Sequence, residues 1–121
     1  MKLTWRIFTV YMLIIVFTIL ANSAFGQITV KQFNAGWNEV NIVKLLDDWE
    51  NFEVKRVYRV NIETYPKIQS DNNVVVLPTI IFYLDGDEAG RLQGNMKFQL
   101  ETTTKELDKM VEEIYNEDKF N

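Results

Sequence analysis

The stretch from Val74 to Phe82 constrains the fold of this chain more than any other, because an apolar run meets a proline and a second apolar run continues after it. Proline cannot donate a ladder hydrogen bond, so Pro78 belongs at a strand start, an edge or a bulge. The residue before a proline is pushed toward extended geometry, which suits Leu77. The stretch therefore predicts a connector that ends at Leu77 and a buried strand from about Thr79 to Leu84.

The rest of the chain supplies strands and helices in alternation. Residues 28–33 alternate apolar and polar side chains, which is typical of a strand. Apolar residues at helical spacing predict a helix from Glu39 to Phe52, with Asn38 as its N-cap. The further elements expected are a strand over Glu53–Ile62, a helical turn within 63–73, an Asp85-Gly86 hairpin turn, a strand over Glu88–Gln93, and a last helix capped by Thr102 or Thr103. This order predicts an α/β fold.

The absence of two residue types limits the chemistry. The chain has no cysteine and no histidine, so thiol chemistry, disulfides, Cys/His metal sites and histidine acid–base catalysis are excluded. The net charge of -4 and the lack of a basic stripe in the sequence argue against a nucleic-acid partner. No metal or cofactor is expected.

The first 26 residues have the pattern of an export signal. Lys2 and Arg6 precede an apolar run over residues 7–20, and small and polar residues follow up to Gly26, where cleavage is expected. The alternative is an uncleaved membrane anchor, because residues 3–22 are just long enough to span a bilayer. Both interpretations place a domain over residues 27–121 outside the cytoplasm, in the periplasm or cell envelope. Loss of the two basic residues changes the net charge from -4 to -6.

Several motifs in register with these elements resemble those of the thioredoxin family. Trp37 and the four residues after it resemble the active-site turn, and Val76-Leu77-Pro78-Thr79 resembles the cis-proline loop. Val60-Asn61-Ile62-Glu63 is similar to the motif at the end of a strand, while Asp85-Gly86 and Gly94 match the final hairpin and the groove glycine. The resemblance covers nearly all of residues 27–121. It implies a thioredoxin-like α/β fold, with a central mixed sheet of about four strands flanked by helices, and a cis peptide bond before Pro78.

The chain departs from this family at the residues that perform redox chemistry. Asn38 and Asn41 occupy the two cysteine positions. The family's turn uses a helix N-terminus to lower the pKa of a cysteine whose thiolate attacks a disulfide, and an amide cannot ionise in this way. The family's buried acid falls on Gln32, and its basic neighbour falls on Arg59, which then has no acid partner at that position. Thiol–disulfide exchange is excluded, and no catalytic residue is expected.

Binding is the function that the resemblance leaves in place. In the family, the backbone before the cis proline pairs with an extended substrate segment. By resemblance, the binding surface for an extended polypeptide or a protein partner consists of Trp37, Asn38, Asn41, Leu77, Pro78 and Gly94. Two alternatives stay open for single residues: Trp37 as a cover over the core, and the two asparagines as helix caps.

Two other functions also stay open. One is an enzyme without thiols, in which carboxylates such as Glu39 or Asp85 act in a reshaped cleft. The other is an accessory subunit of a membrane-anchored envelope complex, which requires that the N-terminal segment is retained. Contact with a membrane is expected only in that case.

Overall fold

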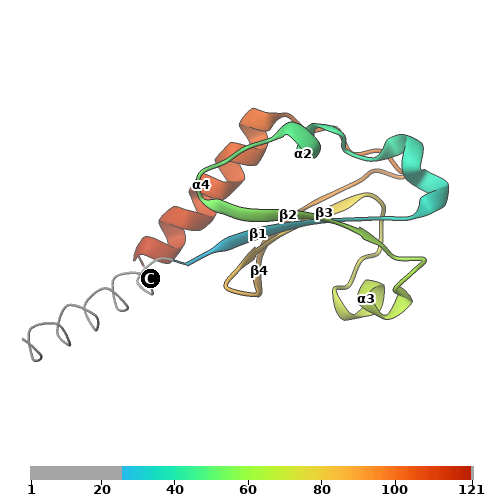
Figure 1. Cartoon of the computed structure of the whole chain (residues 1–121), viewed down its shortest axis with the longest axis horizontal. Helices are drawn as coiled ribbons and strands as arrows, with labels where there is room; N and C mark the ends of the chain where they lie inside the picture. Colours follow the sequence, from blue (N-terminus) through green and yellow to red (C-terminus); the bar gives the residue numbers. More distant parts are fainter. Residues whose placement is uncertain (1–25, 121) are drawn as a thin grey trace, which may run out of the picture.

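The computed structural model describes residues 26–120, so the predicted export signal or anchor lies outside the described residues except for Gly26. Figure 1 shows a single sheet with helices on both sides. The elements in chain order are β1 (Ile28–Asn34), the 3₁₀ helix η1 (Gly36–Asn41), α2 (Leu45–Asp48), β2 (Val54–Asn61), α3 (Pro66–Asp71), β3 (Thr79–Leu84), β4 (Asp87–Gln93) and α4 (Thr104–Phe120). Within residues 26–120, no helix is long and apolar enough to cross a membrane.

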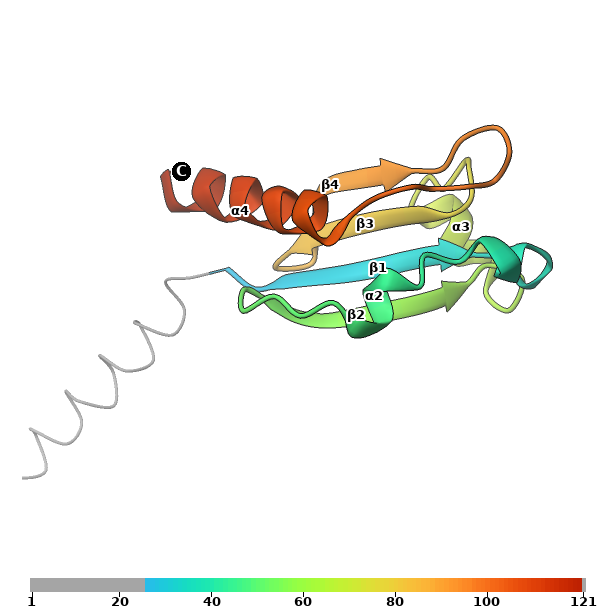
Figure 2. The same cartoon turned by 90° about the horizontal axis from the view of Figure 1, so that it is seen from above.

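The sheet has four strands in the order β2-β1-β3-β4. Strands β1 and β2 are parallel, while β3 is antiparallel to both β1 and β4, so the sheet is mixed as expected. Helices α4 and α2 lie over one face, and α3 lies against part of the other (Figures 1 and 2). The face under α3 is called the α3 face below.

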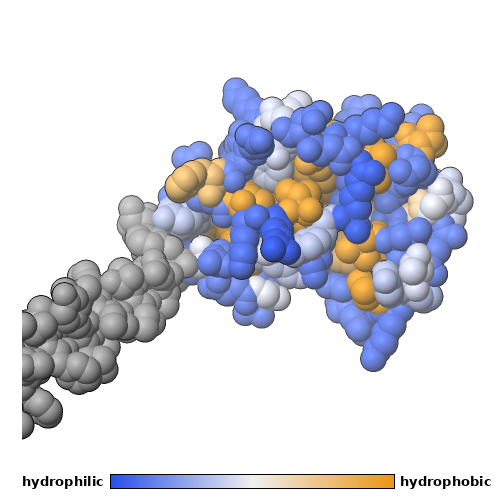
Figure 3. All heavy atoms as spheres, in the orientation of Figure 1, coloured by the Kyte–Doolittle hydropathy of each residue, from blue (hydrophilic) through white to orange (hydrophobic). Residues whose placement is uncertain are grey.

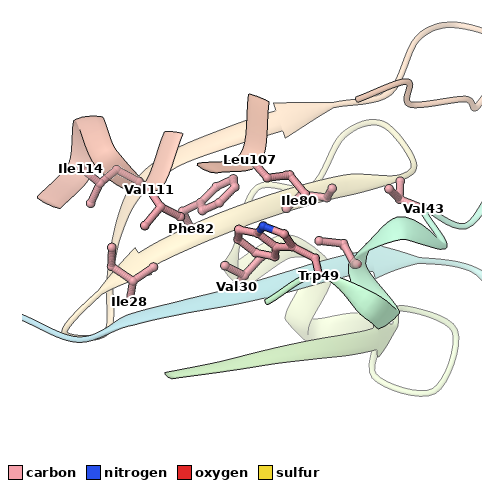
Figure 4. Packing of buried hydrophobic residues seen from close by; sticks show 10 residues of the cluster. Ile28, Val30, Val43, Trp49, Ile80, Phe82, Leu107, Val111 and Ile114 are labelled. Atoms are coloured by element: carbon pink, nitrogen blue, oxygen red, sulfur yellow. The ribbon is translucent and has the colours of Figure 1, made fainter. Parts of the chain in front are cut away.

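The larger hydrophobic core lies between the sheet and α4. Leu107, Val111 and Ile114 recur at helical spacing and pack against Ile80 and Phe82 of the central strand β3, as Figure 4 shows. All but one residue of β3 are buried, because both of its faces are covered. A continuous apolar run with no alternation is the signature of such a strand, and the predicted bounds of 79–84 are confirmed.

The hairpin and the last helix also agree with the sequence. Asp85 and Gly86 both have positive φ, at 52° and 91°, as a two-residue turn between antiparallel strands requires. Helix α4 is capped by Thr103, whose hydroxyl oxygen accepts a hydrogen bond from the Glu106 N–H at 3.2 Å. Thr102 in turn donates its hydroxyl to the Glu106 carboxylate at 2.8 Å.

The predicted helix from Glu39 to Phe52 is wrong. The segment contains η1, a break, and α2, which is one turn long; Ile42 and Trp49 are extended, with ψ of 143° and 129°. Asn38 is not an N-cap but lies inside η1 with non-helical dihedrals, and Phe52 is fully exposed.

The break follows from a competing hydrogen bond. The buried side-chain amide of Gln32 accepts from the Val43 N–H at 2.7 Å and approaches the Val43 carbonyl at 3.4 Å. Val43 therefore gives its N–H to a side chain on β1 rather than to a preceding helical carbonyl. Val43, Leu46 and Trp49 still reach the core at a spacing of three residues, so the apolar pattern is satisfied without a continuous helix.

We predict that Gln32→Leu lowers the free energy of unfolding by about 1–3 kcal/mol, because the buried Val43 N–H loses its acceptor. Urea denaturation measures the loss, and amide hydrogen exchange at Val43 should become faster. The control is Gln93→Leu, at an exposed strand position, which should change stability little. Equal stability of Gln32→Leu and the native chain would contradict the role of this amide.

Candidate functional site

Three segments meet at one end of the sheet. In the strand register, Phe33 lies opposite Thr79, and Thr79 lies opposite Gln93. The end of β1, the start of β3 and the end of β4 therefore lie at the same end of the sheet. The segments that continue from these strands are η1, the connector 74–78 and the loop 94–99. Together they are called the loop end of the sheet. The predicted site residues all lie on these segments.

The connector and the loop approach each other through their backbones. The Leu77–Pro78 peptide bond is cis, as the resemblance implied. The Gly94 N–H donates to the Pro78 carbonyl at 2.8 Å. A Cβ atom on Gly94 would lie 2.5 Å from the Leu77 carbonyl oxygen, so only glycine fits at this position. Leu77 and Pro78 are themselves buried.

The connector has backbone groups that the protein leaves unpaired. Within residues 26–120, the N–H groups of Val75, Val76 and Leu77 donate to no acceptor, and the carbonyls of Val75 and Leu77 accept no hydrogen bond. The Val76 carbonyl accepts from the Thr79 hydroxyl at 2.7 Å. Backbone groups in a protein are almost always paired where they are buried, so this unpaired run is unusual: Val75 is exposed, Val76 is half-buried and Leu77 is buried.

Asparagine side chains hold η1 in place. The Asn38 amide, only 2% exposed, donates to the Asn34 side chain at 2.9 Å and to the Phe98 carbonyl at 3.1 Å, and it accepts from Asn41 at 2.7 Å. Asn34 also donates to the Asn38 carbonyl at 3.0 Å. Asn38 therefore joins β1, η1 and the loop 94–99 and has its hydrogen bonds satisfied internally.

Several apolar side chains are exposed at the loop end of the sheet. Trp37, 61% exposed, packs edge-on against Phe98, with the ring centroids 5.0 Å apart. Val40, Val75 and Met96 are also exposed. Figure 3 shows hydrophobic atoms at the surface where η1 lies. Of the two interpretations of Trp37, its exposure favours a surface role.

The loop 94–99 presents its side chains on a fixed frame. The Asn95 side-chain oxygen accepts the N–H groups of Lys97 at 2.8 Å and Gln99 at 3.2 Å, and the Asn95 N–H donates to the Gln99 carbonyl at 2.8 Å. Phe98 takes a positive φ of 60°. The hydrophobic periodicity of the sequence does not identify Phe98 or Met96 as site residues, because both lie in a turn. The one sequence signal for them is the presence of two hydrophobic residues in a polar loop.

We expected Arg59 to have no acid partner at the position that Gln32 occupies. It has acid partners elsewhere. Arg59 pairs with Asp47 of α2, and Glu39 of η1 lies 3.9 Å away. The guanidinium therefore ties β2 to the broken helical segment on the protein surface. Beneath η1, Gln32 forms hydrogen bonds with the backbone of Val43.

The carboxylates considered for catalysis do not form a pair. Glu39 lies on η1 at the loop end, whereas Asp85 lies at the opposite end of β3, where its side chain accepts the Gln27 N–H at 2.9 Å. Among the described residues, no group of three or more acidic side chains is placed to hold a metal ion.

Comparison with solved structures identifies the fold as that of thioredoxin. A mutant thioredoxin from Halobacterium salinarum superposes with a TM-score of 0.59 at 16% identity, covering 74% of this chain and 75% of that chain. Fasciola hepatica thioredoxin gives 0.56 at 22% identity, covering 80% and 89%, and a Schistosoma mansoni thioredoxin gives 0.56 at 17% identity, covering 80% and 85%. No family model and no curated protein matches the sequence. The chain thus has a thioredoxin-like fold without cysteines, and it cannot perform thiol–disulfide exchange.

We predict that Gly94→Ala destabilises the protein by about 1–3 kcal/mol, because the new methyl group meets the Leu77 carbonyl and the backbone must shift. Thermal or urea unfolding measures the change, and backbone amide shifts should move at residues 75–79. The matched control is Gly90→Ala, whose methyl would meet the flexible end of Met110 at 3.0 Å and Ile114 at an ordinary contact distance of 3.8 Å. If both variants cost the same, the close approach at Gly94 does not constrain the loop end.

Proposed function

We propose that this protein is a redox-inactive binding module that takes up an extended polypeptide segment at the loop end of its sheet. The observation that carries the proposal is the unpaired backbone of Val75–Leu77 at the same end of the sheet as an exposed aromatic pair, Trp37 and Phe98. A bound segment pairs with this backbone as an added strand, and its main-chain hydrogen bonds supply affinity for many sequences.

Selection among segments comes from the apolar side chains. Trp37, Phe98 and Met96 offer surface to alternate side chains of the bound segment, since neighbouring side chains on a strand point to opposite faces. Aromatic residues are enriched at the energetic centres of interfaces because they bury a large area with few rotatable bonds. The partner we propose therefore presents an extended segment with at least one apolar side chain.

The predicted site residues divide into two roles in this proposal. Trp37 contacts the partner directly, and Leu77 contributes its backbone N–H and carbonyl groups. Pro78, Gly94 and Asn38 shape the surface from below, since the first and last of these are buried and Gly94 leaves room at the Leu77 carbonyl. Asn41 donates to Asn38 and so supports the same frame.

The place of action we propose is outside the cytoplasm, in the periplasm or cell envelope. This rests on the pattern of residues 1–26, with its basic start, apolar run and small residues before Gly26. Binding without thiol chemistry suits a chaperone-like or adaptor role toward exported polypeptides, and equally an accessory subunit of an envelope complex.

We predict that a photo-crosslinker placed at the exposed Met96 captures polypeptides in envelope extracts, and that Trp37→Ala combined with Val75→Asp reduces this capture at least about tenfold. Both substitutions lie at exposed positions, so the fold should persist. Mass spectrometry of the crosslinked peptides should show extended segments with apolar residues. Leu77→Asp is less suitable, because Leu77 is buried.

The matched control is Phe52→Asp, because Phe52 is fully exposed and precedes β2, at the end of the sheet away from the loop end. This variant should capture as well as the native chain. Equal capture by the Trp37→Ala, Val75→Asp protein would refute the proposed surface. A hydrolytic activity removed by Glu39→Gln would favour the enzyme alternative instead.

A further inference from the structure

Strand β2 leaves one edge of the sheet open. It is eight residues long, and within residues 26–120 it pairs only with β1. Figure 2 shows β2 at the margin of the sheet, with no strand outside it. An edge of this length is a template on which another extended chain can pair, unless its side chains prevent pairing.

The side chains at this edge are basic, although the whole chain is acidic. Lys55, Arg56 and Arg59 of β2 are exposed, and the register places Lys31 of β1 opposite Tyr58. Arg59 is neutralised by Asp47 and Glu39, but among the described residues no carboxylate lies within 4.0 Å of Lys31 or Arg56. Although the net charge of the chain is -4, this edge therefore carries cations on two neighbouring strands that are not neutralised by an ion pair.

A cleft of about 550 Å³ opens beside this edge on the α3 face. Thr29 and Lys31 of β1, Tyr58 of β2, Tyr83 of β3 and Asn72 line it. The Lys31 ammonium lies 5.1 Å from the centre of the Tyr83 ring, and Arg56 donates to the Tyr58 hydroxyl at 3.4 Å. The cleft thus combines aromatic walls with positive charge, and it is not filled by any described side chain.

Tyr83 keeps its proton in this cleft. Burial, followed by the charge of Glu88, raises the pKa of Tyr83, while Arg91 acts in the opposite direction. Its hydroxyl donates to the Asn72 side chain at 2.7 Å. Glu88 itself is engaged by Arg91, so it does not neutralise Lys31.

The charge pattern of β2 opposes pairing with a second copy of the same chain. In an antiparallel pair of two β2 strands centred on Val57, Lys55 of one copy would lie opposite Arg59 of the other. Like charges directly opposite one another destabilise a strand pair. The same residues attract a strand of the opposite charge, and this complementarity identifies the kind of partner.

We propose that β2 is a second docking edge, and that it adds an extended, acidic segment of another polypeptide. Carboxylates at alternate positions of that segment all project onto the α3 face, where they meet Arg56 and reach toward Lys31 in the cleft. This edge does not involve the connector 74–78, so it can be occupied together with the loop end or without it.

The test uses the full-length protein and a fluorescein-labelled peptide, Thr-Glu-Val-Glu-Val-Glu-Thr, in fluorescence anisotropy titrations. Three peptides serve as comparisons: one with lysines for the glutamates, one with the same residues in blocks, and one N-methylated at alternate residues. We expect the acidic alternating peptide to bind at least about tenfold more tightly than each of them. We also expect its affinity to fall as salt is raised, because the charges are near the surface.

We predict that Lys31→Glu combined with Arg56→Glu weakens this binding at least about tenfold, because each reversal replaces an attraction by a repulsion. The control, Lys105→Glu with Lys109→Glu, makes the same charge change on α4, which covers the other face. This control should change the affinity for the peptide by less than about twofold. Backbone amide shifts should map to residues 54–61, and Trp37→Ala with Val75→Asp should bind normally, which separates this edge from the loop end.

Three outcomes would overturn the proposal. Equal binding of the N-methylated peptide would mean that charge alone, without strand pairing, accounts for the affinity. An equal loss of peptide affinity in the α4 control would mean that the net charge of the protein, rather than the β2 edge, determines binding. No binding of the acidic peptide would leave the basic residues as a guard against strand aggregation, or as a contact to anionic lipid if phosphatidylglycerol vesicles bind the native chain and not the double variant.

Discussion

The loop end of this protein depends on side-chain amides that replace helical hydrogen bonds. The Gln32 side chain accepts a hydrogen bond from the Val43 N–H, so a regular helix does not continue after η1. The Asn38 side chain forms hydrogen bonds with Asn34, Asn41 and the Phe98 carbonyl, and Asn34 donates to the Asn38 carbonyl. These contacts bring β1, η1 and the loop 94–99 into one arrangement. Without them, nothing in the apolar pattern of residues 39–52 would prevent a continuous helix, and Trp37 and Phe98 would not be fixed against each other.

The strands and the last helix could be predicted because their burial leaves a clear periodicity. β3 is buried on both faces and reads as an unbroken apolar run, β1 alternates, and α4 presents Leu107, Val111 and Ile114 at helical spacing. The thioredoxin-like fold followed from motifs at fixed positions between these elements. The structural comparisons confirm that fold at identities of 16–22%, where sequence periodicity alone says little about topology.

The segment after β1 could not be predicted because the deciding contacts are distant in sequence. A spacing of three between Val43, Leu46 and Trp49 fits a helix, and it also fits a chain laid across a core in short turns. Which one forms is decided by Gln32, eleven residues away, and by the loop 94–99, sixty residues from Asn38. The exposed residues Phe98 and Met96 could not be predicted as site residues for the same reason. The fold of the loop 94–99, which brings Phe98 against Trp37 of η1, is not visible in the local sequence.

The side-chain amides at and around the family's two cysteine positions also determine how this end of the molecule responds to its surroundings. None of Gln32, Asn34, Asn38 and Asn41 gains or loses a proton in the ordinary pH range, and none can be oxidised to a disulfide. The hydrogen bonds among these four side chains therefore depend neither on the redox poise of the compartment nor on its acidity. The carboxylate contacts of this region are different in kind, since Glu63 accepts the Trp37 N–H and Arg59 pairs with Asp47 and Glu39. A pair of cysteines in this turn would form a redox couple, whereas the amide network that stands here has no oxidised form.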